Sequence, residues 1–282
     1  MQVQSNAEQL LFTTVRIETR SPKESGSGTG FIFNYRVGDQ QVPVLVTNKH
    51  VVKGSDVGTF FFTLGKGGQP VIGEKIDLEV TDFEDAWHGH PDPDVDIAVM
   101  PLALIRNSIE KTGKQLFYRA ITQDLVPSKD QLDELDAIEE VLFIGYPNGI
   151  YDTVNLIPIA RRGITATPIQ IDYEGKPKFL IDGSVFPGSS GSPVFICNTG
   201  GYTTKSGKTT LGGGRVLFLG IIAAVFYRED EGAMTLRPVP TENIPAFTTR
   251  QMIDLGVVYK FSAVLETIEN FIKVRAPELL RS

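Results

Sequence analysis

The chain has 282 residues, of which 41% are hydrophobic and 22% charged, and its formal net charge is −7 at pH 7. This length suits one large domain or two small ones, and the composition is ordinary for a globular protein. Because no Lys/Arg run stands out, the sequence argues against nucleic acid as the main partner, and because no stretch of about 18 apolar residues occurs, it predicts no membrane span.

Short apolar runs separated by Gly, Pro, Asn and Asp recur along the chain. Many are rich in Val, Ile and Phe, which favour strands. In the N-terminal part we expect strands at residues 10–18, 30–35, 42–46, 71–80 and 96–102. In the C-terminal part we expect them at residues 140–145, 156–165, 178–182, 193–197, 216–226 and 257–261. This spacing indicates a β-barrel or β-sandwich rather than βαβ units.

Three other segments interrupt the strand pattern. Residues 106–136 are polar and lack alternation, which indicates a linker between two β halves. Residues 198–214 are rich in Gly, Thr and Lys, which predicts a long mobile hairpin loop. Near the C-terminus, apolar residues recur at helical spacing over 262–274, which predicts a helix docked on the second β half.

Cys197 is the single cysteine, so no disulfide can form within the chain. We expect its thiol to be buried and structural, because it lies in a predicted strand. The N-terminal residues include no basic segment followed by a long apolar one, so no signal peptide is expected. Secreted enzymes of this size often carry disulfides, and both features therefore favour a cytoplasmic location.

A serine between glycines is the first candidate for chemistry. Residues 188–193 read GSSGSP and lead directly into the predicted strand PVFIC. Glycines let such a turn adopt unusual backbone angles, and successive N–H groups in it can form an oxyanion hole. On this interpretation, Ser190 is a nucleophile. The simpler interpretation is that the segment is only a Gly/Ser-rich turn between two strands.

A histidine and an aspartate lie at the ends of two predicted strands. His50 follows the apolar run VLVTNK, and an imidazole is the usual base that activates a hydroxyl. Asp96 leads into IAVM, where a carboxylate could orient that imidazole. Asp94 is the close rival, because period-2 alternation puts both aspartates on one face. The alternative roles are a half-buried structural histidine and an aspartate that only marks the start of a strand.

The order His50, Asp96, Ser190 is that of the chymotrypsin-type triad. TNKHVV, DVDIAVM and PGSSGSPV are similar to the histidine, aspartate and serine motifs of trypsin-like peptidases. SGSGTGFIF, IGYPNGIYD and ARRGITA resemble segments of disulfide-free bacterial members, and the likeness extends from about residue 11 to residue 266.

The resemblance implies an all-β fold of two six-stranded antiparallel β-barrels with a C-terminal helix. We expect one peptidase domain over residues 1–282, with an N-terminal barrel at about 8–105, a linker at about 106–137, a C-terminal barrel at about 138–261 and the helix at about 262–274.

The resemblance also implies a serine endopeptidase that works through an acyl-enzyme. Ser190 is the implied nucleophile and His50 the general base, oriented by Asp96. The N–H groups of Gly188 and Ser190 form the implied oxyanion hole. The chain departs from secreted relatives at Ser189, where many have an aspartate that pairs with a new N-terminus, so activation by clipping is not supported. Ser192 replaces a second glycine.

The residue six positions before the nucleophile lies at the bottom of the P1 pocket in this family. That residue is the neutral Ser184, and the segment GIIAAV, which includes Ala223 and Val225, resembles the pocket wall. Since Val225 would narrow the opening, we expect small or medium apolar P1 residues. Asp182 keeps a basic preference open.

Other functions carry less support in the sequence. His88 and His90 could be two metal ligands, but no Cys or Glu cluster completes a site, and a loop-shaping role fits them better. Residues 198–214 do not form a phosphate-binding loop, because no Gly-Lys-Ser/Thr follows a strand with the required spacing. We expect no metal and no cofactor, and a peptide or protein as substrate, with a regulatory partner left open. The alternatives are a catalytically silent binding module and an esterase-type hydrolase.

Overall fold

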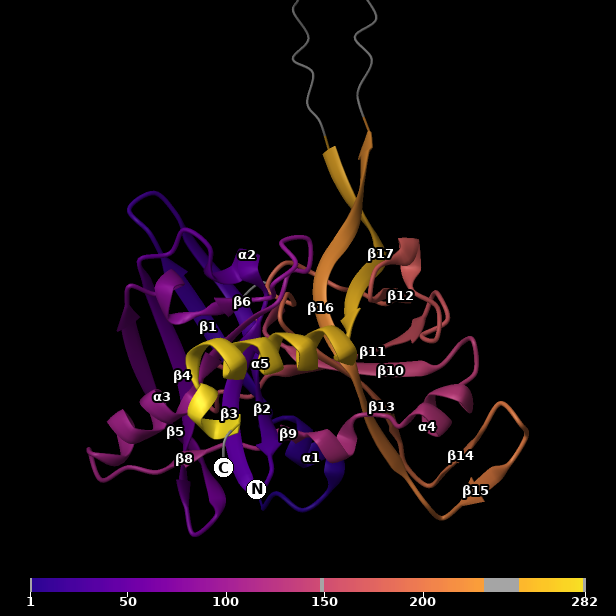
Figure 1. The fold of residues 1–282 in the computed structure, drawn as a ribbon, viewed down its shortest axis with the longest axis horizontal. Coiled ribbons are helices and arrows are strands. Elements are labelled where there is room, and N and C mark those ends of the chain that lie inside the picture. The colour runs from indigo at the N-terminus through magenta and orange to yellow at the C-terminus, as the bar shows by residue number, and fades with distance from the viewer. Residues whose placement is uncertain (1, 148–149, 231–248, 281–282) are drawn as a thin grey trace, which may run out of the picture.

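Two β units lie side by side, and a C-terminal helix packs across both of them (Figure 1). The computed structural model describes residues 2–147, 150–230 and 249–280. The chain is mostly β, and the helix α5 (Phe261–Arg275) contacts strands of each unit. The predicted C-terminal helix is therefore confirmed, one residue longer at each end than the sequence indicates.

The N-terminal unit is an open nine-stranded sheet in the described part of the chain. Seven strands form the path β5-β4-β1-β2-β3-β7-β6, while β8 pairs with β4 and β9 pairs with β2. The bounds are β1 Thr14–Arg20, β2 Ser25–Val37, β3 Gln40–Thr47, β4 Val57–Lys66, β5 Gln69–Thr81, β6 His88–Gly89, β7 Ala98–Pro101, β8 Leu116–Phe117 and β9 Ile121–Thr122.

The C-terminal unit is a closed barrel with the strand order β10-β11-β12-β17-β16-β13. Its bounds are β10 Glu140–Gly145, β11 Ile159–Thr165, β12 Lys178–Asp182, β13 Pro193–Asn198, β16 Arg215–Asp230 and β17 Thr249–Lys260. A separate two-stranded hairpin, β14 (Gly201–Thr203) with β15 (Thr209–Leu211), occupies most of the predicted loop at 198–214. The expectation of two six-stranded barrels is thus confirmed only for the C-terminal unit.

Four further helices are short, and two of them lie where the sequence suggested a linker. Their bounds are α1 Asn6–Leu10, α2 Lys49–Val52, α3 Leu102–Glu110 and α4 Lys129–Asp133, with 3₁₀ turns at Glu84–Ala86, Gln123–Leu125, Tyr173–Gly175 and Pro277–Leu280. In α3, Leu102, Ile105 and Ile109 are buried at helical spacing. Segment 106–136 therefore carries most of α3, the helix α4, and the short strands β8 and β9, which pair with β4 and β2 of the N-terminal sheet.

The strand β4 was not expected from the sequence. Its burial alternates at Phe60 and Phe62, which point into the core, so the period-2 signal was present in the run VGTFFFTLGK. None of the helices in the described ranges combines the length and apolarity that a membrane crossing requires.

A shared apolar cluster joins the two units. Rings of Phe31 and Phe33 in β2 lie 5.4 and 6.0 Å from that of Phe218 in β16, and Phe195 in β13 lies 5.8 Å from it. Each such pair adds about 0.5–1.5 kcal/mol beyond its buried area. The buried face of α5, including Ile268, completes the cluster. This packing holds fixed the two edges that face one another across the site.

Candidate active site

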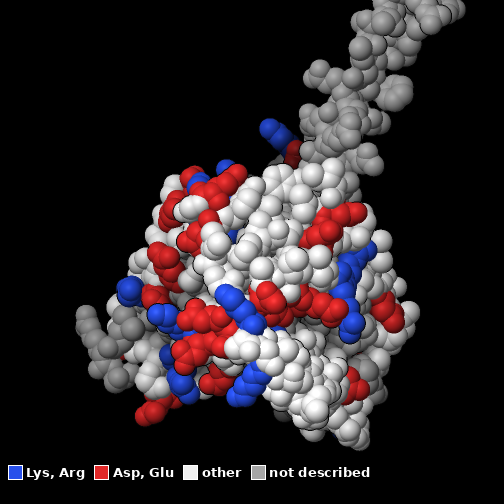
Figure 2. All heavy atoms as spheres, turned by 90° about the vertical axis from the view of Figure 1, so that its right-hand side faces the viewer, with Lys and Arg blue, Asp and Glu red and all other residues white. Residues whose placement is uncertain are grey.

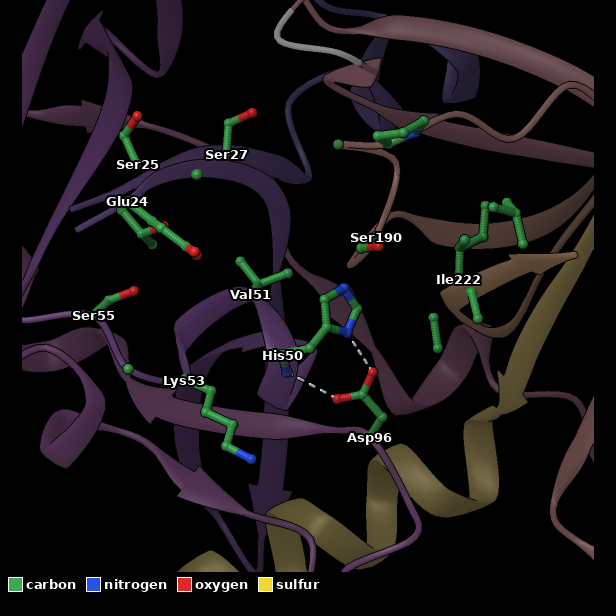
Figure 3. A pocket seen from close by; sticks show the side chains of 18 of the residues that line it. Glu24, Ser25, Ser27, His50, Val51, Lys53, Ser55, Asp96, Ser190 and Ile222 are labelled. Atoms are coloured by element: carbon green, nitrogen blue, oxygen red, sulfur yellow. Dashed lines mark hydrogen bonds and ion pairs between the residues drawn. The ribbon is translucent and has the colours of Figure 1, made fainter. Parts of the chain in front are cut away.

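A cleft of about 620 Å³ contains side chains from both units. The first unit contributes His50 and Asp96, and the second contributes Ser190 and the segment from Ile222 to Val225 (Figure 3). The cleft brings together six of the seven residues singled out in the sequence: Gly188, Ala223 and Val225 also line it, and Ser184 does not.

His50 lies on α2, one turn of helix directly after β3. Val51 and Val52 are buried on the inner side of that turn, which leaves the His50 side chain 49% exposed on the side of the cleft. Asn48 precedes the helix in extended conformation and donates its side-chain amide to the Asp96 backbone carbonyl, at 2.7 Å. The segments that carry His50 and Asp96 are therefore joined by this bond next to the contact between the two side chains.

The carboxylate of Asp96 holds His50 at two points. Asp96 Oδ2 lies 2.5 Å from His50 Nδ1, and Asp96 Oδ1 accepts the His50 backbone N–H at 3.0 Å. A carboxylate can only accept hydrogen bonds, so Nδ1 of His50 carries the proton. In the tautomer that carries its proton on Nδ1 alone, the lone pair of Nε2 can accept a hydrogen bond or a proton. Figure 3 shows Ser190 beside the ring of His50, on the side away from Asp96.

Asp94, the rival aspartate, faces elsewhere. Its carboxylate lies 2.7 Å from Lys176 Nζ, and the hydrogen bond and charge of that lysine lower the pKa of Asp94. Its backbone carbonyl accepts the Tyr259 hydroxyl at 2.7 Å. The two aspartates do not share a face, because residues 91–97 form a bend and the strand β7 begins only at Ala98.

The loop that carries Ser190 is a pair of tight turns that require glycine. Ser189 N–H donates to Phe186 O, and Ser192 N–H donates to Ser189 O. Gly188 and Gly191 have φ values of +86° and +88°, which favour glycine. The turn therefore raises the partly exposed Ser190 between two glycines.

Two backbone donors of the loop that carries Ser190 have no partner in the part of the chain that the structure describes. Within the described residues, neither the Gly188 N–H nor the Ser190 N–H donates to an acceptor of the protein. Both residues line the cleft. Donors of this kind can bind negative charge that develops on a substrate oxygen.

One end of the cleft is apolar. Its walls are Val185, Phe186, Ile222, Ala223, Ala224 and Val225. Val185 is 2% exposed and belongs to the core cluster of the barrel, and the partly buried Val225 packs against that cluster. Ser184 is exposed, and its carbonyl accepts a hydrogen bond from Arg161, which stacks on Phe186 at 4.6 Å. Asp182 does not line the cleft either.

The other end of the cleft is polar, and sequence reasoning missed it. Its lining includes Ser21, Glu24, Ser25, Ser27, Lys53 and Ser55. They come from the β1–β2 hairpin and from the segment after α2. The alternating serines before the run GTGFIF were a readable signal of a strand with a polar face.

The two other histidines anchor the loop that contains Asp96. His88 Nε2 lies 2.7 Å from Asn270 Oδ1 of α5. His90 is buried, accepts the Asp92 N–H at Nδ1, and directs Nε2 toward Glu266 at 3.5 Å. Among the residues that the structure describes, no cluster of three His, Cys, Asp or Glu side chains could hold a metal ion.

The fold and the cleft define a chymotrypsin-like protein with one cysteine and hence no internal disulfide. The chain belongs to the family of trypsin-like peptidase domains, whose model matches residues 28–201. No curated protein matches its sequence significantly.

Solved structures with a similar fold are distant in sequence. The active form of the Rv3671c protease from M. tuberculosis is 18% identical, covering 92% of this chain and 81% of that chain with a TM-score of 0.44. A serine endoprotease from Yersinia pestis is 15% identical, covering 96% and 68%, with a TM-score of 0.46. The thermostable serine protease AL20 from an extremophilic microorganism is 12% identical, covering 94% and 99%, with a TM-score of 0.46.

Proposed function

We propose that this protein is a serine endopeptidase in which Ser190 is the nucleophile, His50 the general base and then acid, and Asp96 the residue that orients His50. The observation that carries the proposal is the 2.5 Å contact from Asp96 Oδ2 to His50 Nδ1, with Ser190 on the opposite side of the ring. This arrangement directs the basic nitrogen of His50 at the hydroxyl it would deprotonate. Membership of the peptidase family makes peptides or proteins the substrate class.

The proposed reaction passes through an acyl-enzyme. Ser190 Oγ attacks the scissile carbonyl carbon while its proton passes to His50 Nε2. The carbonyl oxygen becomes an oxyanion that accepts hydrogen bonds from the N–H groups of Gly188 and Ser190. The C–N bond then breaks as His50 returns the proton to the leaving amine. Water, deprotonated by His50, attacks the ester, and collapse of the second intermediate releases the acid and restores Ser190.

The proposed P1 preference is for small or medium apolar side chains. Val185 and Val225 line the apolar end of the cleft, and no charged side chain lines that end within the described residues. A basic P1 residue would need a carboxylate there, and Asp182 lies outside the lining. Cleavage profiling with a peptide library would test this directly: efficient cleavage after Lys or Arg would refute the preference.

We propose that residues 1–282 form one peptidase domain. Its two halves lie at about 8–105 and 138–261, and each half has the form of a β-barrel. The open N-terminal sheet is compatible with a barrel that strand pairing leaves unclosed. The single cysteine supports a cytoplasmic location as a further proposal.

A fluorophosphonate probe would test the nucleophile. The wild type should be labelled and Ser190→Ala should not, whereas Ser189→Ala should keep a folded protein whose nucleophile still reacts. Absence of labelling in the folded wild type would favour a catalytically silent binding module. Labelling together with ester hydrolysis but no peptide cleavage would favour an esterase-type hydrolase.

A further inference from the structure

One buried threonine joins the two units at the nucleophile loop. Thr29 in β2 is fully buried, and each of its polar groups has a partner. Its N–H donates to Ser190 O at 2.9 Å, and its Oγ1 donates to Gly188 O at 3.0 Å. The same Oγ1 accepts the Tyr146 N–H at 3.0 Å, and its carbonyl accepts the Thr47 hydroxyl at 2.7 Å. Thr29 therefore contacts the loop of the proposed nucleophile from the other half of the molecule.

The same residue is linked to the strand that leads to His50. Thr47 is the last residue of β3, three positions before His50, and its hydroxyl bonds the Thr29 carbonyl. Thr29 is thus bonded on one side to the strand that ends near the base and on the other to the loop with the nucleophile. Among the described side chains, no other hydroxyl hydrogen-bonds both to this loop and to Tyr146, the residue that follows β10.

The backbone packs so closely around Thr29 that no other group can replace its hydroxyl. A Cβ atom at Gly191 would overlap the Thr29 carbonyl oxygen, and one at Gly145 would lie 2.7 Å from Thr29 Oγ1. The two glycines let the backbones of β10 and the nucleophile loop approach Thr29 directly. Neither position leaves space in which a water molecule could take over the bonds of the hydroxyl.

The hydroxyl acts on a peptide group that could otherwise turn. The peptide from Gly188 to Ser189 is held at one end by Thr29 Oγ1 and at the other by Phe186 O, which accepts the Ser189 N–H. Glycine adopts positive and negative φ about equally well, so Gly188 by itself does not select one orientation. The bond from Thr29 keeps the Gly188 carbonyl turned toward β2 and away from where a substrate oxygen would bind.

We propose that Thr29 is a positioning residue, whose hydroxyl fixes the orientation of the nucleophile loop and keeps the Gly188 and Ser190 N–H groups free to bind the oxyanion. This inference rests on the proposed peptidase function. Thr29 does not line the cleft, so it acts through Gly188 and Ser190. Its loss should therefore lower the rate of the chemical step more than the affinity for the substrate.

The test compares Thr29→Val, Thr29→Ser and Thr267→Val. Valine keeps the shape but removes the hydroxyl, and serine keeps the hydroxyl. Thr267 is a matched control, since it is also fully buried and donates only to Ala263 O within α5. The measurements are kcat and KM on a cleaved peptide, inhibition by a peptide aldehyde that forms a tetrahedral adduct, and hydrogen exchange of residues 186–192.

For Thr29→Val we expect kcat to fall about 100-fold, as for the loss of one oxyanion donor, with KM changed less than about threefold. Aldehyde inhibition should weaken by a similar factor, and exchange in residues 186–192 should become faster. Thr29→Ser and Thr267→Val should stay within about threefold of the wild type. Thr29→Ala, measured below its melting temperature, replaces Thr29→Val if the valine variant does not fold.

Two results separate the inference from the proposed function. If the hydroxyl-free variant is folded and keeps kcat, aldehyde affinity and exchange near the wild-type values, the inference about Thr29 is wrong even though the enzyme is active. If the wild type neither cleaves peptides nor reacts with the probe, the proposed function is wrong. In that case, unchanged exchange in residues 186–192 of the variant refutes the positioning role, and faster exchange supports it.

Discussion

Asp96→Asn is the substitution that most directly tests the proposed triad. The asparagine amide has nearly the same shape as the carboxylate, and its oxygen can still accept the His50 backbone N–H now bonded at 3.0 Å. Its NH2 group would then face His50 Nδ1, where the carboxylate oxygen now lies at 2.5 Å. A donor at this point forces Nδ1 to be an acceptor and puts the imidazole proton on Nε2. His50 would then have no lone pair to take the proton of Ser190.

The expected loss in kcat is about 10⁴-fold, which is the effect of the same substitution in the chymotrypsin-type Ser-His-Asp triad. This loss corresponds to about 5.4 kcal/mol of activation free energy. The assay is cleavage of a peptide found by library profiling, with folding checked by thermal denaturation. The matched control is Asp94→Asn, which removes a carboxylate two residues away that pairs with the exposed Lys176. The control should keep kcat/KM within about twofold.

The opposite pattern would refute the assignment. If Asp94→Asn abolished turnover and Asp96→Asn did not, the orienting carboxylate would be the wrong one. If both variants were fully active, the carboxylate would have no role in the chemistry, although the geometry around His50 would still need an explanation.

Three further expectations follow from local features. Gly191→Ala should abolish fluorophosphonate labelling, since its Cβ would overlap a buried carbonyl oxygen, whereas Gly207→Ala, with a similar φ of +84° but open surroundings, should label normally; equal labelling would refute the steric argument. Burial and a hydrogen bond to the carboxylate of Glu269 in α5 raise the pKa of Tyr35 to about 12, above its unfolded value near 10. The neutral phenol therefore stabilises the folded protein below pH 10, and this contribution is lost as the pH rises toward 12. The urea midpoint of the wild type should therefore fall more between pH 8 and pH 11 than that of Tyr35→Phe, and parallel falls would contradict this. Cys197 is only partly buried, not fully buried as the sequence suggested, and this burial raises the pKa of its thiol. Iodoacetamide at pH 8 should therefore alkylate the native thiol more slowly than the urea-unfolded one, and equal rates would count against this shielding.

Most strands could be predicted because their signals are local. The runs around β2, β3, β10, β12 and β13 are apolar and bounded by turn residues, and their expected positions overlap the observed ones. The helix α3 and the strand β4 were missed, although their periodicities were present in the sequence. The closure of a barrel depends on pairing between distant strands, such as β10 with β13 and β12 with β17, which no local window contains.

Some features of the candidate site could likewise be predicted from neighbouring residues, and others could not. The glycines around Ser190 and the strand-end position of His50 are local features, because turn geometry depends on the residues of the turn. The choice between the two aspartates is not local. It depends on a bend before β7 and on Lys176, which lies 82 residues from Asp94 and captures its carboxylate.

The pocket and the link between the units were also decided by tertiary packing. Ser184 follows the family's spacing, yet it is exposed outside the cleft, and its neighbour Val185, a residue of the barrel core, lines the cleft instead. Nothing in the run GTGFIF marks Thr29, since its partners are Thr47 in β3, Tyr146 just after β10, and the Ser190 loop. By itself, the sequence determined the class of fold and the residue types of the candidate site, because strand periodicity and turn chemistry act over a few residues. Only the tertiary structure decided which groups meet, because hydrogen bonds form between atoms that folding brings within about 3 Å, however far apart they lie in the chain.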